Sequence, residues 1–302
     1  LPSDLALNCR NLCREYYDLM DNRSAYVNKL QGELRMAFPQ YLGIFSKVTI
    51  NTSLTLLETY TSPSAFLEAD KQEIIDIIKS TARFGLTYAQ NKYNAIIQAA
   101  TDANQFGYII DSNIKRIRLY ISFIRKYDEE INSILESMHE LAAANEDTDF
   151  VKQIRLIETF KGAGFLSAMS LMGEIGDFSA FSKPKQLFAY FGLDPAVKQS
   201  GKFEGTKIQM SKRGSAIARR VIHTLTLQSI SASRTGESKN PVLLDYYLKK
   251  CESKPKLVAM GAVSHKVCNM IFAILRDSKP FEIITPQEHI KKYNAAKCDV
   301  AA

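Results

Sequence analysis

The clearest pattern in the chain is a series of mostly apolar residues between positions 106 and 141, spaced at alternating steps of four and three. The series is Phe106, Ile110, Asn113, Ile117, Tyr120, Ile124, Tyr127, Ile131, Ile134, Met138 and Leu141. A period of 3.5 residues is typical of a coiled coil, and a polar residue within the seam, here Asn113, can fix register or partner number. The pattern predicts a coiled-coil arm over residues 105–147. A long helix within a bundle is the alternative.

Residues 1–104 show helical periodicity as well. Apolar residues recur at three- and four-residue steps from Leu5 to Phe38, which predicts a long amphipathic helix that ends at Pro39. Ser62 followed by Pro63 has the form of a helix start, and the helix it predicts runs through Ile74, Ile77 and Ile78 to an end near Gly85. We therefore expect residues 1–104 to form an N-terminal helical region.

The composition changes after the polar residues 144–149. Eight of the 14 glycines fall between Gly162 and Gly214, which indicates short helices joined by tight turns. Two more helices are expected, around 243–250 and 257–275, with Pro280 and Pro286 closing the ordered part. The predicted fold is mainly α, with a helical arm followed by a compact domain over residues 150–302.

Composition restricts the classes of function. The 302 residues carry a formal net charge of +7, which suits a polyanion or an anionic membrane surface. Because we find no apolar run long enough to span a bilayer and no secretory signal, we expect an intracellular protein without a membrane partner. The five cysteines lack paired CxxC spacing, so we expect reduced thiols and no metal site, Cys9 and Cys13 included.

Residues 154–172 have the form of two helices joined by a Gly-Ala-Gly turn at Gly162 to Gly164. Glycines let a turn approach a phosphate, and the free N–H groups at the start of the second helix can bind it. The segment therefore predicts a helix-hairpin-helix element that contacts the backbone of DNA or RNA. An ordinary pair of helices with a glycine turn fits the same residues.

The segment from Gln199 to Gly236 is strongly basic, with Glu204 as its single acid. It contains Lys202, Lys207, Lys212, Arg213, Arg219, Arg220 and Arg234, beside Gly201, Gly205 and Gly214. Clustered cations with an open backbone favour phosphate binding over a solvated face, which would mix charges of both signs. Ser200 lies at the start of this segment, just before Gly201, and could attack a phosphodiester with cationic support, although serine before glycine is also common in turns.

Several sequence blocks, in order, resemble a known family. They are Phe160-Lys-Gly-Ala-Gly164, Met172-Gly-Glu-Ile-Gly-Asp-Phe-Ser-Ala-Phe181, Gln186-Leu-Phe-Ala-Tyr-Phe-Gly-Leu-Asp-Pro195, Gln199-Ser-Gly201 and Ser211-Lys-Arg-Gly214. This order resembles the C-terminal domain of the IS116/IS110/IS902 family of insertion-sequence transposases, whose relatives include pilin-gene-inverting recombinases. The resemblance is strongest over residues 150–279 and extends to the preceding helical arm in general pattern.

The resemblance implies a bacterial, cytoplasmic, DNA-associated recombinase. In that family a RuvC-like domain holds Mg²⁺ with four acids, a serine that matches Ser200 becomes joined to DNA, a guide RNA pairs with the DNA, and a coiled coil joins protomers. The family's final acidic motif, Asp-x-x-Asp-Ala, is missing before the first long helix. We therefore expect residues 1–104 to hold only the downstream part of the acidic domain, with no cofactor bound by this chain and Mg²⁺ required by the complete protein.

The sequence thus predicts a transposase that binds DNA, and a guide RNA, and uses Ser200 for strand exchange. The residues expected to contact nucleic acid are Gly162, Gly164, Gly201, Lys202, Lys207, Lys212, Arg213, Arg219 and Arg220. One alternative is a non-catalytic helix-hairpin-helix protein, which the missing acids favour. Another is a helical scaffold whose coiled coil binds proteins, which the basic glycine-rich segment disfavours.

Overall fold

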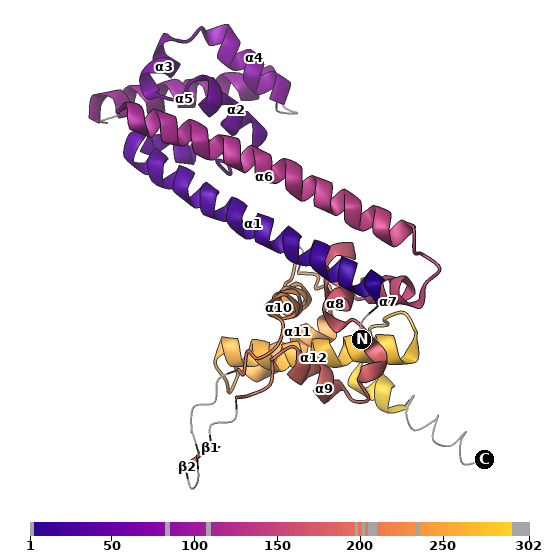
Figure 1. The fold of residues 1–302 in the computed structure, drawn as a ribbon. Coiled ribbons are helices and arrows are strands. Elements are labelled where there is room, and N and C mark those ends of the chain that lie inside the picture. Colours follow the sequence, from indigo (N-terminus) through magenta and orange to yellow (C-terminus); the bar gives the residue numbers. More distant parts are fainter. Residues whose placement is uncertain are drawn as a thin grey trace, which may run out of the picture. The chain divides into compact units, whose positions relative to one another are not determined.

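The computed structural model describes residues 3–81, 85–106, 110–196, 199–200, 203–204, 210–233 and 236–291. The protein is mainly α-helical, as predicted (Figure 1). Its contacts divide it into two units, the first formed by Leu1–Glu15 with Glu136–Ala302 and the second by Tyr16–Leu135. These limits do not coincide with the boundaries expected at residues 104 and 147. The first unit is discontinuous in sequence, a property that local periodicity does not reveal.

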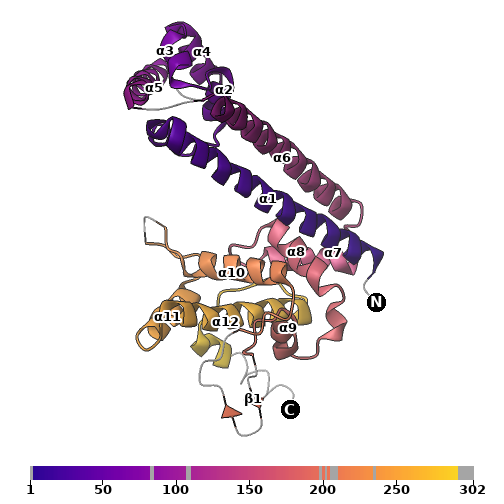
Figure 2. The same ribbon diagram turned by 60° about the vertical axis from the view of Figure 1, so that its left-hand side comes forward.

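The second unit contains most of two long helices. Helix α1 (Asp4–Ala37) and helix α6 (Asp111–Ala143) lie side by side (Figures 1 and 2). Arg23 donates to both carboxylate oxygens of Asp128, and the Tyr26 and Phe123 rings are 4.6 Å apart. Further along α1, Glu33 accepts from Asn113 at 2.9 Å. Residue numbers rise along α1 while those of the contacting residues on α6 fall, so the two helices are antiparallel.

Shorter helices complete the second unit: η1 (Pro39–Gly43), α2 (Asn51–Thr59), α3 (Pro63–Glu68), α4 (Lys71–Thr81) and α5 (Leu86–Phe106). The predicted cap is confirmed, because Ser62 Oγ accepts from Ala65 N at 3.2 Å. The single helix expected after it is two helices instead. Ala69 is extended (ψ 148°), and Asp70 Oδ1 accepts from Gln72 N at 2.7 Å, which caps a new helix.

The middle of the predicted seam is buried within the chain. Ile117 and Ile124 belong to one core cluster with Leu30 and Leu34 of α1, as a helix in a bundle would. The continuous seam from Phe106 is not observed, because α5 ends at Phe106, α6 begins at Asp111, and Ile110 is 45% exposed. A coiled coil between two chains stays a prediction.

Burial of the seam changes what a seam substitution should do. Ile124 is completely buried, so Ile124→Asp should lower the free energy of unfolding by about 4 kcal/mol or more, through lost apolar packing and a buried charge. Leu119→Asp on the same helix, where the side chain is 49% exposed, should change it by less than about 1 kcal/mol. Urea unfolding followed by circular dichroism measures both. An Ile124→Asp protein of unchanged stability that loses only self-association would favour the intermolecular seam.

The first unit contains the remaining elements. They are α7 (Asp149–Glu158), α8 (Phe165–Ile175), η2 (Phe178–Ala180), α9 (Pro184–Tyr190), the strands β1 (Gln199–Ser200) and β2 (Phe203–Glu204), α10 (Ala216–Ile230), α11 (Pro241–Cys251) and α12 (Lys256–Asp277). Helices α11 and α12 confirm the two helices expected after Pro241. Helix α12 contacts α7, α9, α10 and α11 and is therefore the centre of this unit's core.

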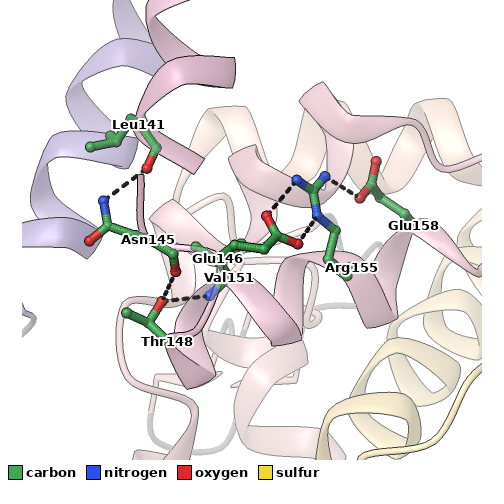
Figure 3. Close-up of polar contacts among 7 residues, drawn as sticks. All are labelled: Leu141, Asn145, Glu146, Thr148, Val151, Arg155 and Glu158. Carbon is green, nitrogen blue, oxygen red and sulfur yellow. Dashed lines mark hydrogen bonds and ion pairs between the residues drawn. The ribbon is translucent and has the colours of Figure 1, made fainter. Parts of the chain in front are cut away.

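The polar break after α6 is an ordered turn (Figure 3). Asn145 donates to Leu141 O at 2.9 Å, and Thr148 Oγ1 caps α7 by accepting from Val151 N at 3.3 Å. Arg155 donates to both carboxylate oxygens of Glu146 at 2.9 Å and to Glu158 at 2.9 Å. These bonds fix how the chain enters α7.

Helix α12 is long and apolar enough to cross a membrane, contrary to the expectation that the chain has no apolar run of that length. Its buried residues include Ala259, Val263, Val267 and Ile271. Contacts with four other helices bury this face, so α12 is the core helix of its unit.

Candidate nucleic-acid interface

The chain between α9 and α10 forms a hairpin. Strands β1 and β2 are antiparallel, with Gln199 opposite Glu204 and Ser200 opposite Phe203, and Pro195 forms a bridge with Met210. The backbone of Ser200 is therefore on the first strand of the hairpin. The side chain of Ser200 and all of Gly201, Lys202 and Lys207 lie outside the described residues.

Residues 190–195 and 210–214 join this hairpin to the helices, and we call them the neck. Lys212 N donates to Gly192 O at 3.0 Å, and Ser211 N donates to Asp194 O at 2.8 Å. Ser211 Oγ also donates to Asp194 Oδ1 at 2.5 Å. Side-chain and backbone bonds thus connect the two sides of the neck at successive levels.

Two glycines let the sides of the neck approach each other. A Cβ atom added to Gly214 would lie 1.9 Å from Tyr190 O, and one added to Gly192 would lie 2.5 Å from Gly214 N. Gly192 also has a φ of 66°, where other residues are strained. No side chain fits between these backbones, so both positions require glycine for this contact.

The predicted phosphate-binding cations have different surroundings. Lys212 and Arg213 are exposed in the neck, and Arg220 is exposed on α10, as phosphate contacts require. Arg219 differs, because its Nη1 donates to Phe191 O at 3.1 Å and to Gly214 O at 2.6 Å. This nitrogen of Arg219 binds carbonyl oxygens of the neck, whereas a phosphate contact by Arg219 stays a prediction.

The glycine turn joins α7 and α8, and these two helices pack together. That they form a helix-hairpin-helix element stays a prediction. Gly162 has a φ of 101°, and a Cβ added there would lie 2.9 Å from Gln228 Cβ of α10. A Cβ on Gly164 would meet nothing within 4 Å. One glycine is therefore needed for the turn and its packing on α10, while phosphate binding at the other stays a prediction.

The first turns of α1 hold the end of α8. Arg14 donates to both carboxylate oxygens of Glu174, at 2.8 and 3.0 Å, and Arg10 donates to Gly173 O at 2.8 Å. Glu174 is 3% exposed as a whole residue and 4% exposed in its side chain, so this pair compensates a buried charge. The sequence analysis did not predict this ion pair. Its only signal in the sequence is a single acid, Glu174, within the otherwise apolar helix α8.

Cys9 and Cys13 are buried on the same stretch of α1. Burial raises the pKa of the Cys9 thiol to about 12 and that of Cys13 to about 11. Both thiols are therefore protonated near neutral pH, which suits packing more than nucleophilic chemistry.

Within the described ranges, no group of three or more His, Cys, Asp or Glu residues lies close enough to hold a metal ion. Mg²⁺ prefers several oxygen ligands, among them carboxylates. These residues do not fit a magnesium site, so we derive no chemical step through the metal.

Residues 154–247 match the sequence profile described as "Transposase IS116/IS110/IS902 family". Residues 154–247 therefore form a transposase domain of this family. The matched range begins within α7 and ends within α11, so it includes the glycine turn, the neck and the hairpin. Every residue that the sequence analysis assigned to nucleic-acid binding or catalysis lies inside it.

Two curated relatives are similar to the chain. The "Transposase for insertion sequence element IS1111A" of Coxiella burnetii is 34% identical over 104 residues, which are 34% of this chain and 26% of that protein. The "Insertion element IS110 uncharacterized 43.6 kDa protein" of Streptomyces coelicolor is 21% identical over 275 residues, which are 89% of this chain and 63% of that protein. The chain thus spans less than two thirds of the length of either relative.

Proposed function

We propose that this transposase domain acts in a DNA recombinase and that Ser200 is its nucleophile. The observation that carries the proposal is the placement of Ser200 on a hairpin whose neck bears the exposed cations Lys212 and Arg213, inside the range that matches the family. A hydroxyl beside cations can attack phosphorus, since the cations stabilise charge on the phosphoryl oxygens.

The proposed step exchanges one phosphate ester for another. A bond forms between Ser200 Oγ and the phosphorus of DNA while the bond from phosphorus to a sugar oxygen breaks. The proton of the serine leaves to solvent, and the departing sugar oxygen takes up a proton. The adduct is itself a phosphodiester, so little free energy is lost. A hydroxyl of a second DNA strand can then attack the phosphorus and release Ser200. Trapping labelled DNA on the denatured protein tests this step directly.

The partners we propose are DNA, a guide RNA and a second copy of the chain, in the cytoplasm of a bacterium. DNA is supported by the family match and the basic neck. The guide RNA is supported by the family resemblance. Self-association is supported by the heptad pattern, and Ile134 and Leu141 are seam positions that stay partly exposed.

A second candidate is a nucleic-acid-binding protein without catalysis. It is favoured by the lack of an acidic cluster among the residues that the structure describes. The two candidates share binding and differ in the adduct, so the trapping experiment separates them.

Reversing the charge of Lys212 and Arg213 should weaken binding to DNA. Log K falls as log salt rises, and each cation that contacts a phosphate adds about 0.9 to the magnitude of this negative slope. The double variant to Glu should therefore reduce the magnitude of the slope by about 2. Titrations of a labelled duplex at several salt concentrations measure it. The matched control reverses Lys249 and Lys250 at the end of α11, away from the neck in sequence, and should leave the slope near the parent value. Equal affinity at low and high salt in the parent protein would contradict nucleic-acid binding by the neck.

A further inference from the structure

The side chain of Arg219 contacts both sides of the neck. Arg219 is the fourth residue of α10, and its Nη1 is shared between the carbonyl oxygens of Phe191 and Gly214. Phe191 directly follows α9, and Gly214 stands just before Ser215, which caps α10. One guanidinium therefore ties together the point where the chain leaves the helices and the point where it returns to them.

We propose that Arg219 is a positioning residue that holds the Ser200 hairpin, and that the neck's phosphate contacts belong to Lys212 and Arg213. The inference rests on the proposed function, because positioning affects the reaction only if Ser200 reacts. It assigns Arg219 a task different from that of the neighbouring cations.

The energetics of the neck favour this role. Phe191 and Gly192 are buried in the neck, and a buried carbonyl group needs a donor from the protein. Hydrogen bonds from a charged donor are stronger than those between neutral groups, and Arg219 supplies two. The other links of the neck are neutral backbone bonds and the bond from Ser211 to Asp194. Arg219 thus provides the neck's charged cross-link among the bonds described.

Catalysis explains why such a cross-link matters. Strands β1 and β2 contain two residues each, and an isolated pair of strands this short has little stability of its own. The direction of the hairpin must be set where it joins the helices. Effective attack on phosphorus requires the nucleophile to be held within a fraction of an ångström. Loss of the cross-link should therefore reduce the rate of attack more than the affinity for DNA.

The test compares Arg219→Gln with Arg213→Gln, and uses Arg276→Gln as a control. Arg276 lies at the end of α12 and pairs with Asp277. Hydrogen exchange and DNA titration use the 302-residue chain. Adduct formation at saturating DNA uses a protein in which a four-acid magnesium domain of the family precedes it. Arg276→Gln should match the parent in all three measurements.

Arg219→Gln should raise exchange at the amides of Ser211 and Lys212 at least about tenfold. It should slow adduct formation at saturating DNA at least about tenfold, while the salt slope stays within about 0.3 of the parent. Arg219→Lys keeps a charged donor and should recover part of both losses. Arg213→Gln should instead lower the salt slope by about 1 and leave exchange at Ser211 and Lys212 unchanged.

If Arg219→Gln does not fold, Ser211→Ala gives a second route, because it removes the bond to Asp194 without changing any charge. It should slow the adduct and keep the salt slope. The positioning role is overturned if Arg219→Gln lowers the salt slope by about 1 with exchange unchanged, or if the neck opens and the adduct rate at saturation persists. An adduct that survives in Ser200→Ala overturns the proposed function as well, whereas loss of the adduct only in Ser200→Ala overturns the positioning role alone.

Discussion

Ser200→Ala is expected to abolish the covalent protein–DNA adduct and to keep the affinity for DNA within about twofold of the parent. The adduct requires the hydroxyl, whereas phosphate contacts come from cations and backbone N–H groups. The assay incubates a protein that includes the family's acidic domain with Mg²⁺, guide RNA and labelled DNA, and follows label that migrates with the denatured protein. The 302-residue chain alone should form no adduct.

The control for this variant must be an exposed serine that neither links the neck nor caps the start of a helix. Ser211 bonds Asp194, and Ser215 Oγ accepts from Ala218 N at 3.0 Å to cap α10, so alanine at either position would disturb the site. Ser231 is exposed and donates to Gln228 O of the preceding helix at 3.1 Å. Ser231→Ala should form the adduct at the parent rate. Adduct formation by Ser200→Ala would show that another residue is the nucleophile.

Gly214→Ala should lower the free energy of unfolding by about 3 kcal/mol or more, because the new methyl group would lie 1.9 Å from Tyr190 O. Backbone atoms cannot rotate away as a flexible side chain can, so the two sides of the neck must separate. The variant should also lose most adduct formation. Urea unfolding followed by circular dichroism measures the stability.

Gly261→Ala is the matched control for that substitution. Gly261 lies within α12, and a Cβ added there meets nothing within 4 Å. Alanine is favoured over glycine inside a helix by up to about 1 kcal/mol, so this variant should be slightly more stable than the parent. Opposite signs for the same chemical change would support the close contact in the neck. A Gly214→Ala protein as stable as the parent would contradict it.

Helices with strong local signals were predictable from the sequence. Periodicity and Pro39 placed each end of α1 within one residue of its observed position, and Ser62 with Pro63 located the start of α3. The break at Ala69 was missed because an alanine in a helical pattern gives no warning, and Asp70 competes as a cap through its side chain. The seam's partner was also beyond local reasoning, because burial of Ile124 depends on α1, far away in sequence.

The same limit explains the site. Clustered cations and glycines located the basic segment, and the sequence placed Ser200 at its entrance. Arg219 was grouped with Lys212 and Arg213 because charge alone does not show which cation turns inward to carbonyl oxygens. The two glycines of the neck, Gly192 and Gly214, lie in separate sequence blocks, and only folding shows that these blocks meet.

The ion pair between Arg14 and Glu174 has a consequence for how the protein is made. The two residues are 160 positions apart. A ribosome adds about 5–20 residues per second, so roughly 8–32 seconds pass between synthesis of the arginine and of its partner. During that interval the first turns of α1 have no α8 to pack against, so Cys9 and Cys13, which are buried in the folded protein, are exposed to solvent. We expect the nascent chain to depend on chaperones until α8 leaves the ribosome, and the first unit to fold only after the second is complete.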